Sequence, residues 1–140
     1  EYFALAKATP YNVSPLLRMG RLLLSAGKGA EAQRAFERSL KIGPTLYAHQ
    51  GLGFVLLQKD RFEDACDQFW KSLQYSSGVP VRDVLETQQY LAVALAGSGR
   101  LLEAQRIAES MVTAHPEYLP GKDVLGSIER ALQNKKGKLP

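Results

Sequence analysis

The sequence is poor in the residues that build catalytic and metal sites. Among its 140 residues it has one cysteine, Cys66, and two histidines, His49 and His115. A single cysteine excludes an internal disulfide and any metal site made of several thiolates. A catalytic centre needs several convergent ligands, or a nucleophile beside its base, and the sequence offers neither. We therefore expect no enzyme, no metal site and no cofactor.

Long apolar runs and clustered charge are also missing. The apolar runs at 22–24 and 55–57 are far shorter than the roughly 20 residues of a membrane span. Three of the four net positive charges come from Lys135, Lys136 and Lys138. The rest of the chain is nearly neutral and lacks the basic face that nucleic-acid binding needs, so we expect no nucleic-acid partner.

The composition is that of an ordinary soluble globular protein, with 45% hydrophobic and 23% charged residues. No signal-peptide pattern opens the sequence. Because the first residue is Glu1 rather than Met, we expect a piece of a longer protein, from which a targeting signal could have been removed. The compartment is left open, with a slight preference for the cytoplasm.

What the sequence does have is an internal period. Small residues recur at Gly20, Gly53, Ala92 and Gly126, spaced 33, 39 and 34 apart. Turn-forming residues stand seven positions after each of the first three: Gly27, Asp60 and Gly99. Alanines stand twelve positions after the same three small residues: Ala32, Ala65 and Ala104. Apolar residues follow helical spacing on both sides of each turn, and no segment alternates as a strand does. The period therefore predicts two helices per unit in an all-α chain.

The small residues have a steric reason. Glycine costs about 1 kcal/mol inside a helix relative to alanine, so its recurrence needs a gain in packing. We expect Gly20, Gly53 and Gly126 to let a neighbouring helix approach closely, with the alanines as matching shallow points on the second helix.

With these residues the chain resembles the tetratricopeptide repeat (TPR) family, whose period is 34 residues. The pattern of small residue, Ala, Phe and closing Pro appears as Gly20, Ala32, Phe36 and Pro44, and recurs in part in the later units. The second unit lacks the closing proline, and His49 stands in an aromatic slot, where we expect it to pack. Cys66 is expected to pack as a small hydrophobe.

The resemblance implies an α-solenoid of about three helix-turn-helix repeats in a single domain, with partial flanking helices at both ends. The expected parts are the tail of a preceding repeat at 1–10, repeats at 13–46, 46–79 and 80–118, a terminal helix at 119–134 and a basic tail at 135–140. The third repeat carries about five inserted residues around 75–80. Either a long loop or lengthened helices could accommodate them.

The family implies binding of a peptide or partner protein on the concave face lined by the first helix of each repeat. The residues carried over to that face are Leu17, Arg21, Leu24, Tyr47, Gln50, Phe54, Leu57, Gln58, Gln89 and Val93. Tyr47 and Phe54 are expected to be the main anchors. The same correspondence also places Glu86, Ala96, Asp123 and Ser127 there.

One binding mode known in the family, a clamp on a C-terminal carboxylate, is disfavoured because Glu86 would repel the carboxylate. An apolar helix or extended segment with a few polar contacts suits these residues better. The alternative function is structural: a module that self-associates into a homo-oligomer or braces an adjacent domain.

Overall fold

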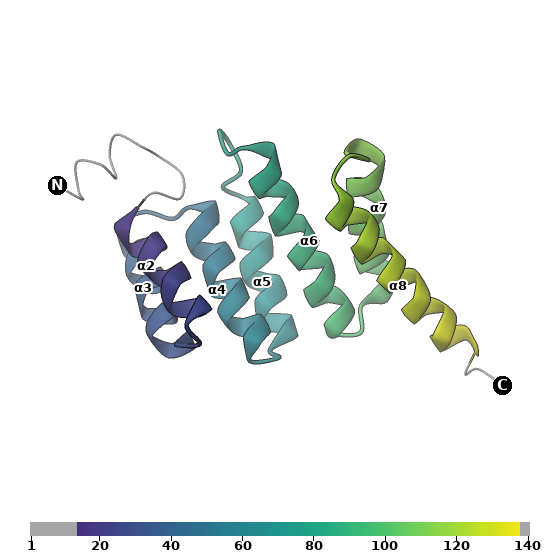
Figure 1. The fold of residues 1–140 in the computed structure, drawn as a ribbon, viewed down its shortest axis with the longest axis horizontal. Coiled ribbons are helices and arrows are strands. Elements are labelled where there is room, and N and C mark those ends of the chain that lie inside the picture. The colour runs from purple at the N-terminus through teal and green to yellow at the C-terminus, as the bar shows by residue number, and fades with distance from the viewer. Residues whose placement is uncertain (1–13, 138–140) are drawn as a thin grey trace. The chain divides into compact units, whose positions relative to one another are not determined.

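The computed structural model describes residues 14–137. In that part of the chain the regular structure is entirely helical, which confirms the all-α prediction (Figure 1). The helices are α2 (Pro15–Ser25), α3 (Gly29–Ile42), α4 (Leu46–Gln58), α5 (Phe62–Leu73), α6 (Val81–Gly97), α7 (Leu101–Ala114) and α8 (Leu119–Gly137).

The chain divides into two compact units, the first ending at Val79 and the second beginning at Pro80. In the first unit α2 packs on α3, α3 on α4 and α4 on α5, and in the second α6 packs on α7 and α7 on α8. Each helical pair lies within one of the ranges 13–46, 46–79 and 80–118. The repeat tail expected at 1–10 lies outside the described residues.

The three predicted turns share one backbone geometry. Gly27, Asp60 and Gly99 all have positive φ, at 78°, 56° and 88°. At the first turn, Lys28 N donates to Leu23 O at 2.8 Å and Gly27 N to Leu24 O at 3.1 Å, and the same pair of bonds recurs at the other two. This is the Schellman motif, which needs a residue that tolerates the left-handed region; glycine does so routinely and aspartate occasionally.

The repeated alanines are buried, and two of the repeated glycines contact the second helix of their pair. Ala32, Ala65 and Ala104 have no exposed surface. A Cβ added at Gly20 would lie 2.6 Å from the ring of Phe36, and one added at Gly53 would lie 2.5 Å from the ring of Phe69. These glycines therefore admit an aromatic ring from the second helix, as the steric argument predicts.

Gly126 does not follow this rule, and the expectation of a close approach there is wrong. The nearest atom that a Cβ at Gly126 would meet is Arg130 Nη1, at 3.5 Å. Its neighbours on that side of α8 include the exposed Lys122, Glu129 and Gln133. Among the described residues, a Cβ at Gly126 would thus meet no atom of a second helix within 4 Å.

The inserted residues are accommodated in both of the expected ways. Residues 74–80 lie outside the helices, and α6 spans 17 residues, compared with 11 in α2 and 13 in α4. At the other end, α8 extends past 134 and includes Lys135 and Lys136, so the start of the predicted tail is helical. Residues 138–140 lie outside the described part.

Candidate partner-binding surfaces

Three of the residues predicted to bind a partner are buried in the first unit. Leu17, Tyr47 and Gln50 are exposed by only 1%, 3% and 1%. Arg21 Nη2 donates to Gln50 Oε1 at 3.3 Å, and the Arg21 guanidinium carbon lies 5.6 Å from the centre of the Tyr47 ring. These contacts join α2 to α4. Leu17, Tyr47 and Gln50 thus contribute to packing and offer little surface to a partner.

Five of the residues predicted to bind a partner remain accessible in this unit. Arg21, Leu24, Phe54 and Leu57 are half-buried, and Gln58 is exposed. Phe54 meets Phe69 edge to face, with ring centres 5.7 Å apart, so its ring is fixed on one side by the core. We call these five residues the α2–α4 surface.

In the second unit, residues from two first helices line one groove of about 370 Å³. Val93 and Ala96 come from α6, and Asp123, Val124, Ser127, Ile128 and Ala131 come from α8. Val93 is 37% exposed. Four of these positions, Val93, Ala96, Asp123 and Ser127, are ones that the resemblance assigns to the inner face. We call this the α6–α8 groove.

Gln89, the other predicted residue of α6, is linked to the start of α8. Tyr118 Oη donates to Gln89 Oε1 at 2.7 Å. Burial raises the pKa of the Tyr118 hydroxyl, and the nearby Glu86 and Tyr90 raise it further. Tyr118 is not among the site residues predicted from the sequence, although an aromatic residue just before a terminal helix is a signal for such a contact.

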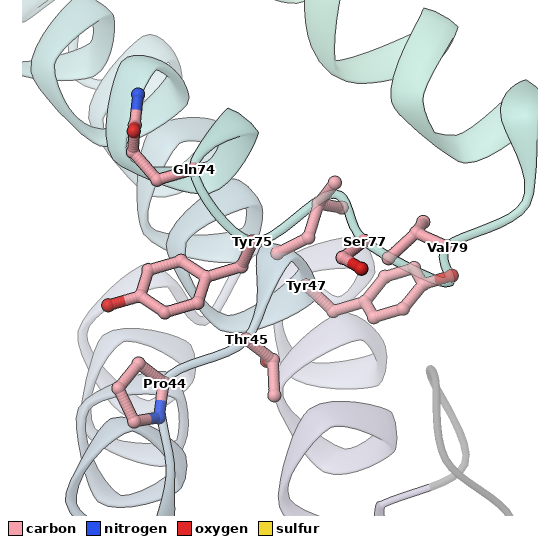
Figure 2. Close-up of a pocket in the computed structure, with 8 residues that line it drawn as sticks. Pro44, Thr45, Tyr47, Gln74, Tyr75, Ser77 and Val79 are labelled. Atoms are coloured by element: carbon pink, nitrogen blue, oxygen red, sulfur yellow. The ribbon is translucent and has the colours of Figure 1, made fainter.

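A second cavity, of about 340 Å³, lies within the first unit (Figure 2). One wall is residues 44–47, where α4 begins, and the other includes Gln74, Tyr75, Ser77 and Val79 from the inserted loop. Tyr75 stacks on His49, with ring centres 5.6 Å apart and planes 19° apart. His49 therefore packs against an aromatic ring, as predicted. The sequence does not predict this pocket, because it leaves the course of the inserted loop open.

The remaining reactive side chains are placed as packing residues or at the surface. Cys66 is buried, in agreement with its expected role. Within residues 14–137, no three His, Cys, Asp or Glu side chains are grouped so that they could hold a metal ion. In the same part of the chain, no helix combines the length and apolar character needed to cross a membrane.

Comparison with known proteins identifies the fold class. No family model matches the sequence, and no curated protein matches it. The structure is similar to the crystal structure of MamA, a TPR-like protein, with a TM-score of 0.73 and 17% sequence identity. The match covers 94% of this chain and 75% of that chain. The chain thus has the α-solenoid fold of TPR-like helical repeats.

At 17% identity the likeness to MamA establishes the fold alone.

Proposed function

We propose that this chain is a non-enzymatic interaction module that binds a peptide or partner protein along the first helices of its repeats. The observation that supports this most directly is the α6–α8 groove, since two helices from successive repeats contribute to a single cavity there. Stacked helical repeats present extended surfaces of this kind, and many of them bind partners.

The lining of the groove favours an apolar segment with a few polar contacts. The side chains of Ala96 and Ala131 are small, and Val93 and Val124 add apolar surface. Asp123 and Ser127 supply polar groups in the same groove. An apolar helix or extended segment could bury side chains between α6 and α8 and pair its polar groups with these two residues.

The α2–α4 surface offers a similar mixture in the first unit. Leu24, Phe54 and Leu57 expose part of their apolar side chains, and Arg21 and Gln58 are polar. We propose that both surfaces contribute to recognition. The alternative function, self-association, has one observation in its favour. Met19 and Leu22 lie on one side of α2 and are exposed by 42% and 66%, so they could form an apolar contact with a second copy.

The test is to fill the α6–α8 groove. Peptides that bind the full chain would be selected from a phage-displayed random library, and their affinities would then be measured for the Ala96→Trp variant. We expect the dissociation constant to rise at least tenfold, because the indole would occupy the groove. The matched control is Ala30→Trp, at an exposed position on α3, which should leave affinity within about twofold.

Circular dichroism would verify that Ala96→Trp folds, and Val93→Asp is the second variant if it does not. If the selected peptides bind these variants as tightly as the unmodified chain, the groove is not the binding site.

A further inference from the structure

The pocket in Figure 2 is bounded by a loop with a defined turn. Val79 N donates to Ser76 O at 3.1 Å, which closes a four-residue turn. Gly78, the third residue of this turn, has φ of 74°, the left-handed value that a type II turn requires at that position. The inserted loop therefore presents Tyr75, Ser77 and Val79 in a fixed arrangement.

Both aromatic rings of the pocket are held in place by neighbouring helices. His49, on which Tyr75 stacks, has its Nδ1 2.9 Å from Gln68 Oε1 of α5. Tyr47 is fixed by the Arg21 guanidinium of α2 and retains only a small exposed area. Figure 2 shows Tyr75 and Tyr47 on either side of Thr45. A ligand would meet the exposed Tyr75 ring in a position that already exists, and Tyr47 would lie beneath it as a buried part of the wall.

The chemistry of the lining restricts the ligand. All the residues that line the pocket are uncharged. Besides the Tyr75 ring, Pro44 and Val79 supply apolar surface, and Gln74 and Ser77 supply hydrogen-bond donors. Without a charged side chain in the lining, the pocket offers no ion pair to a charged ligand group, which would still lose hydration on entry. The pocket therefore favours an uncharged ligand with acceptor groups.

An extended proline-rich segment has these properties. Its backbone has no internal hydrogen bonds, so its carbonyl groups are free to accept from donors, and its rings pack well on aromatic side chains. A volume of about 340 Å³ is near the lower end of the range of ligand pockets, which suits a short stretch of such a segment better than a helix.

We propose that the pocket between the start of α4 and the inserted loop binds a proline-rich segment of a partner protein. The site is distinct from the α6–α8 groove, which lies in the other unit. The insertion into the third repeat thus gives the first unit a recognition site that a repeat of regular length would lack.

The experiment uses a capped hexaproline peptide and the ¹⁵N-labelled full chain. We expect titration to shift the amide signals of Tyr75, Ser77 and Val79, and a capped Gly-Ser hexapeptide to shift none of them. Tyr75→Ala should weaken hexaproline binding at least tenfold, while Tyr75→Phe, which keeps the ring, should stay within about threefold. Tyr90→Ala, the same change in the second unit, serves as the matched control.

Two further variants make the outcome decisive. Val79→Trp fills the pocket and should abolish the shifts if Tyr75→Ala fails to fold. Ala96→Trp, in the α6–α8 groove, should leave hexaproline binding unchanged. The proline-rich site and the α6–α8 groove are therefore tested separately, and one proposal can fail while the other holds. The proposal is overturned if hexaproline causes no shifts, if it shifts residues outside this pocket, or if a folded Tyr75→Ala or Val79→Trp variant binds it as the unmodified chain does.

Discussion

The same substitution, glycine to alanine, should have opposite effects at two positions that the sequence repeat treats as equivalent. Gly53 and Gly126 both stand in the first helix of their repeat, at the phase set by Gly20. A Cβ at Gly53 would lie 2.5 Å from Cε1 and 2.6 Å from Cζ of Phe69. At Gly126 the nearest atom would be Arg130 Nη1, at 3.5 Å, which is an ordinary contact.

The magnitudes follow from two terms. Replacing glycine with alanine inside a helix gains up to about 1 kcal/mol in both cases. At Gly53 this gain is opposed by overpacking, which typically costs about 1–3 kcal/mol. The cost should lie in the upper part of that range, because the Phe69 ring has no exposed surface and is held edge-on by Phe54. We expect Gly53→Ala to destabilise the first unit by about 1–2 kcal/mol, and Gly126→Ala to stabilise the second by about 0.5–1 kcal/mol.

Urea unfolding followed by two probes would test this. Trp70, on α5, is the only tryptophan, so its fluorescence reports on the first unit, whereas circular dichroism reports on the helices of both. Gly53→Ala should lower the midpoint of the fluorescence transition without changing its slope. The double variant Gly53→Ala with Phe69→Leu should lose less stability than the two separate effects predict, because the smaller side chain relieves the clash. A Gly53→Ala variant as stable as the unmodified chain would refute the reasoning.

Two other predictions concern single hydrogen bonds. Ser72 is fully buried, and its hydroxyl donates to Leu46 O at 2.8 Å. Ser72→Ala should therefore destabilise the first unit by about 1–2 kcal/mol, measured by Trp70 fluorescence in urea. The control Ser110→Ala, at an exposed position, should change stability little. Because the pKa of Tyr118 is raised in the folded state, its contribution to stability is complete below its ordinary pKa of about 10 and is lost as the pH rises through the folded value. The stability difference between the unmodified chain and Tyr118→Phe, measured by circular dichroism in urea, should therefore stay constant up to about pH 10 and shrink above it, and a difference that does not shrink there would contradict this.

The repeat could be predicted from the sequence because its signals are steric and local. Gly27, Asp60 and Gly99 stand where the backbone adopts positive φ, and that requirement limits the residue type at each turn. The pairing of a glycine in one helix with a phenylalanine in the next reflects a direct contact between Gly20 and Phe36 and between Gly53 and Phe69. Patterns of this kind repeat with the structure, and a single sequence is enough to detect them.

The surface was harder to predict because repeat position does not determine exposure. Leu17, Tyr47 and Gln50 stand at positions that the family exposes on its inner face, yet α2 and α4 lie close enough to bury them. The deciding contacts, from Arg21 to Gln50 and Tyr47, join residues 29 and 26 positions apart in the sequence. The pocket beside Tyr75 likewise depends on how an inserted loop folds back on α4, which no periodic signal describes.

The three sides of α8 explain why the proposed binding site of the second unit lies where it does. Gly121 faces Met111 of α7 at ordinary contact distance, and the buried Ile128 extends this packed side. Lys122 and Glu129 are both exposed, and their charged side chains give a second side of α8 that faces solvent. A third side carries Val124, which is apolar and lines the groove together with residues of α6. If α8 binds a partner through this side, the α6–α8 groove is the surface that receives it, so substitutions at Lys122 or Glu129 should leave peptide affinity unchanged while Ala96→Trp weakens it.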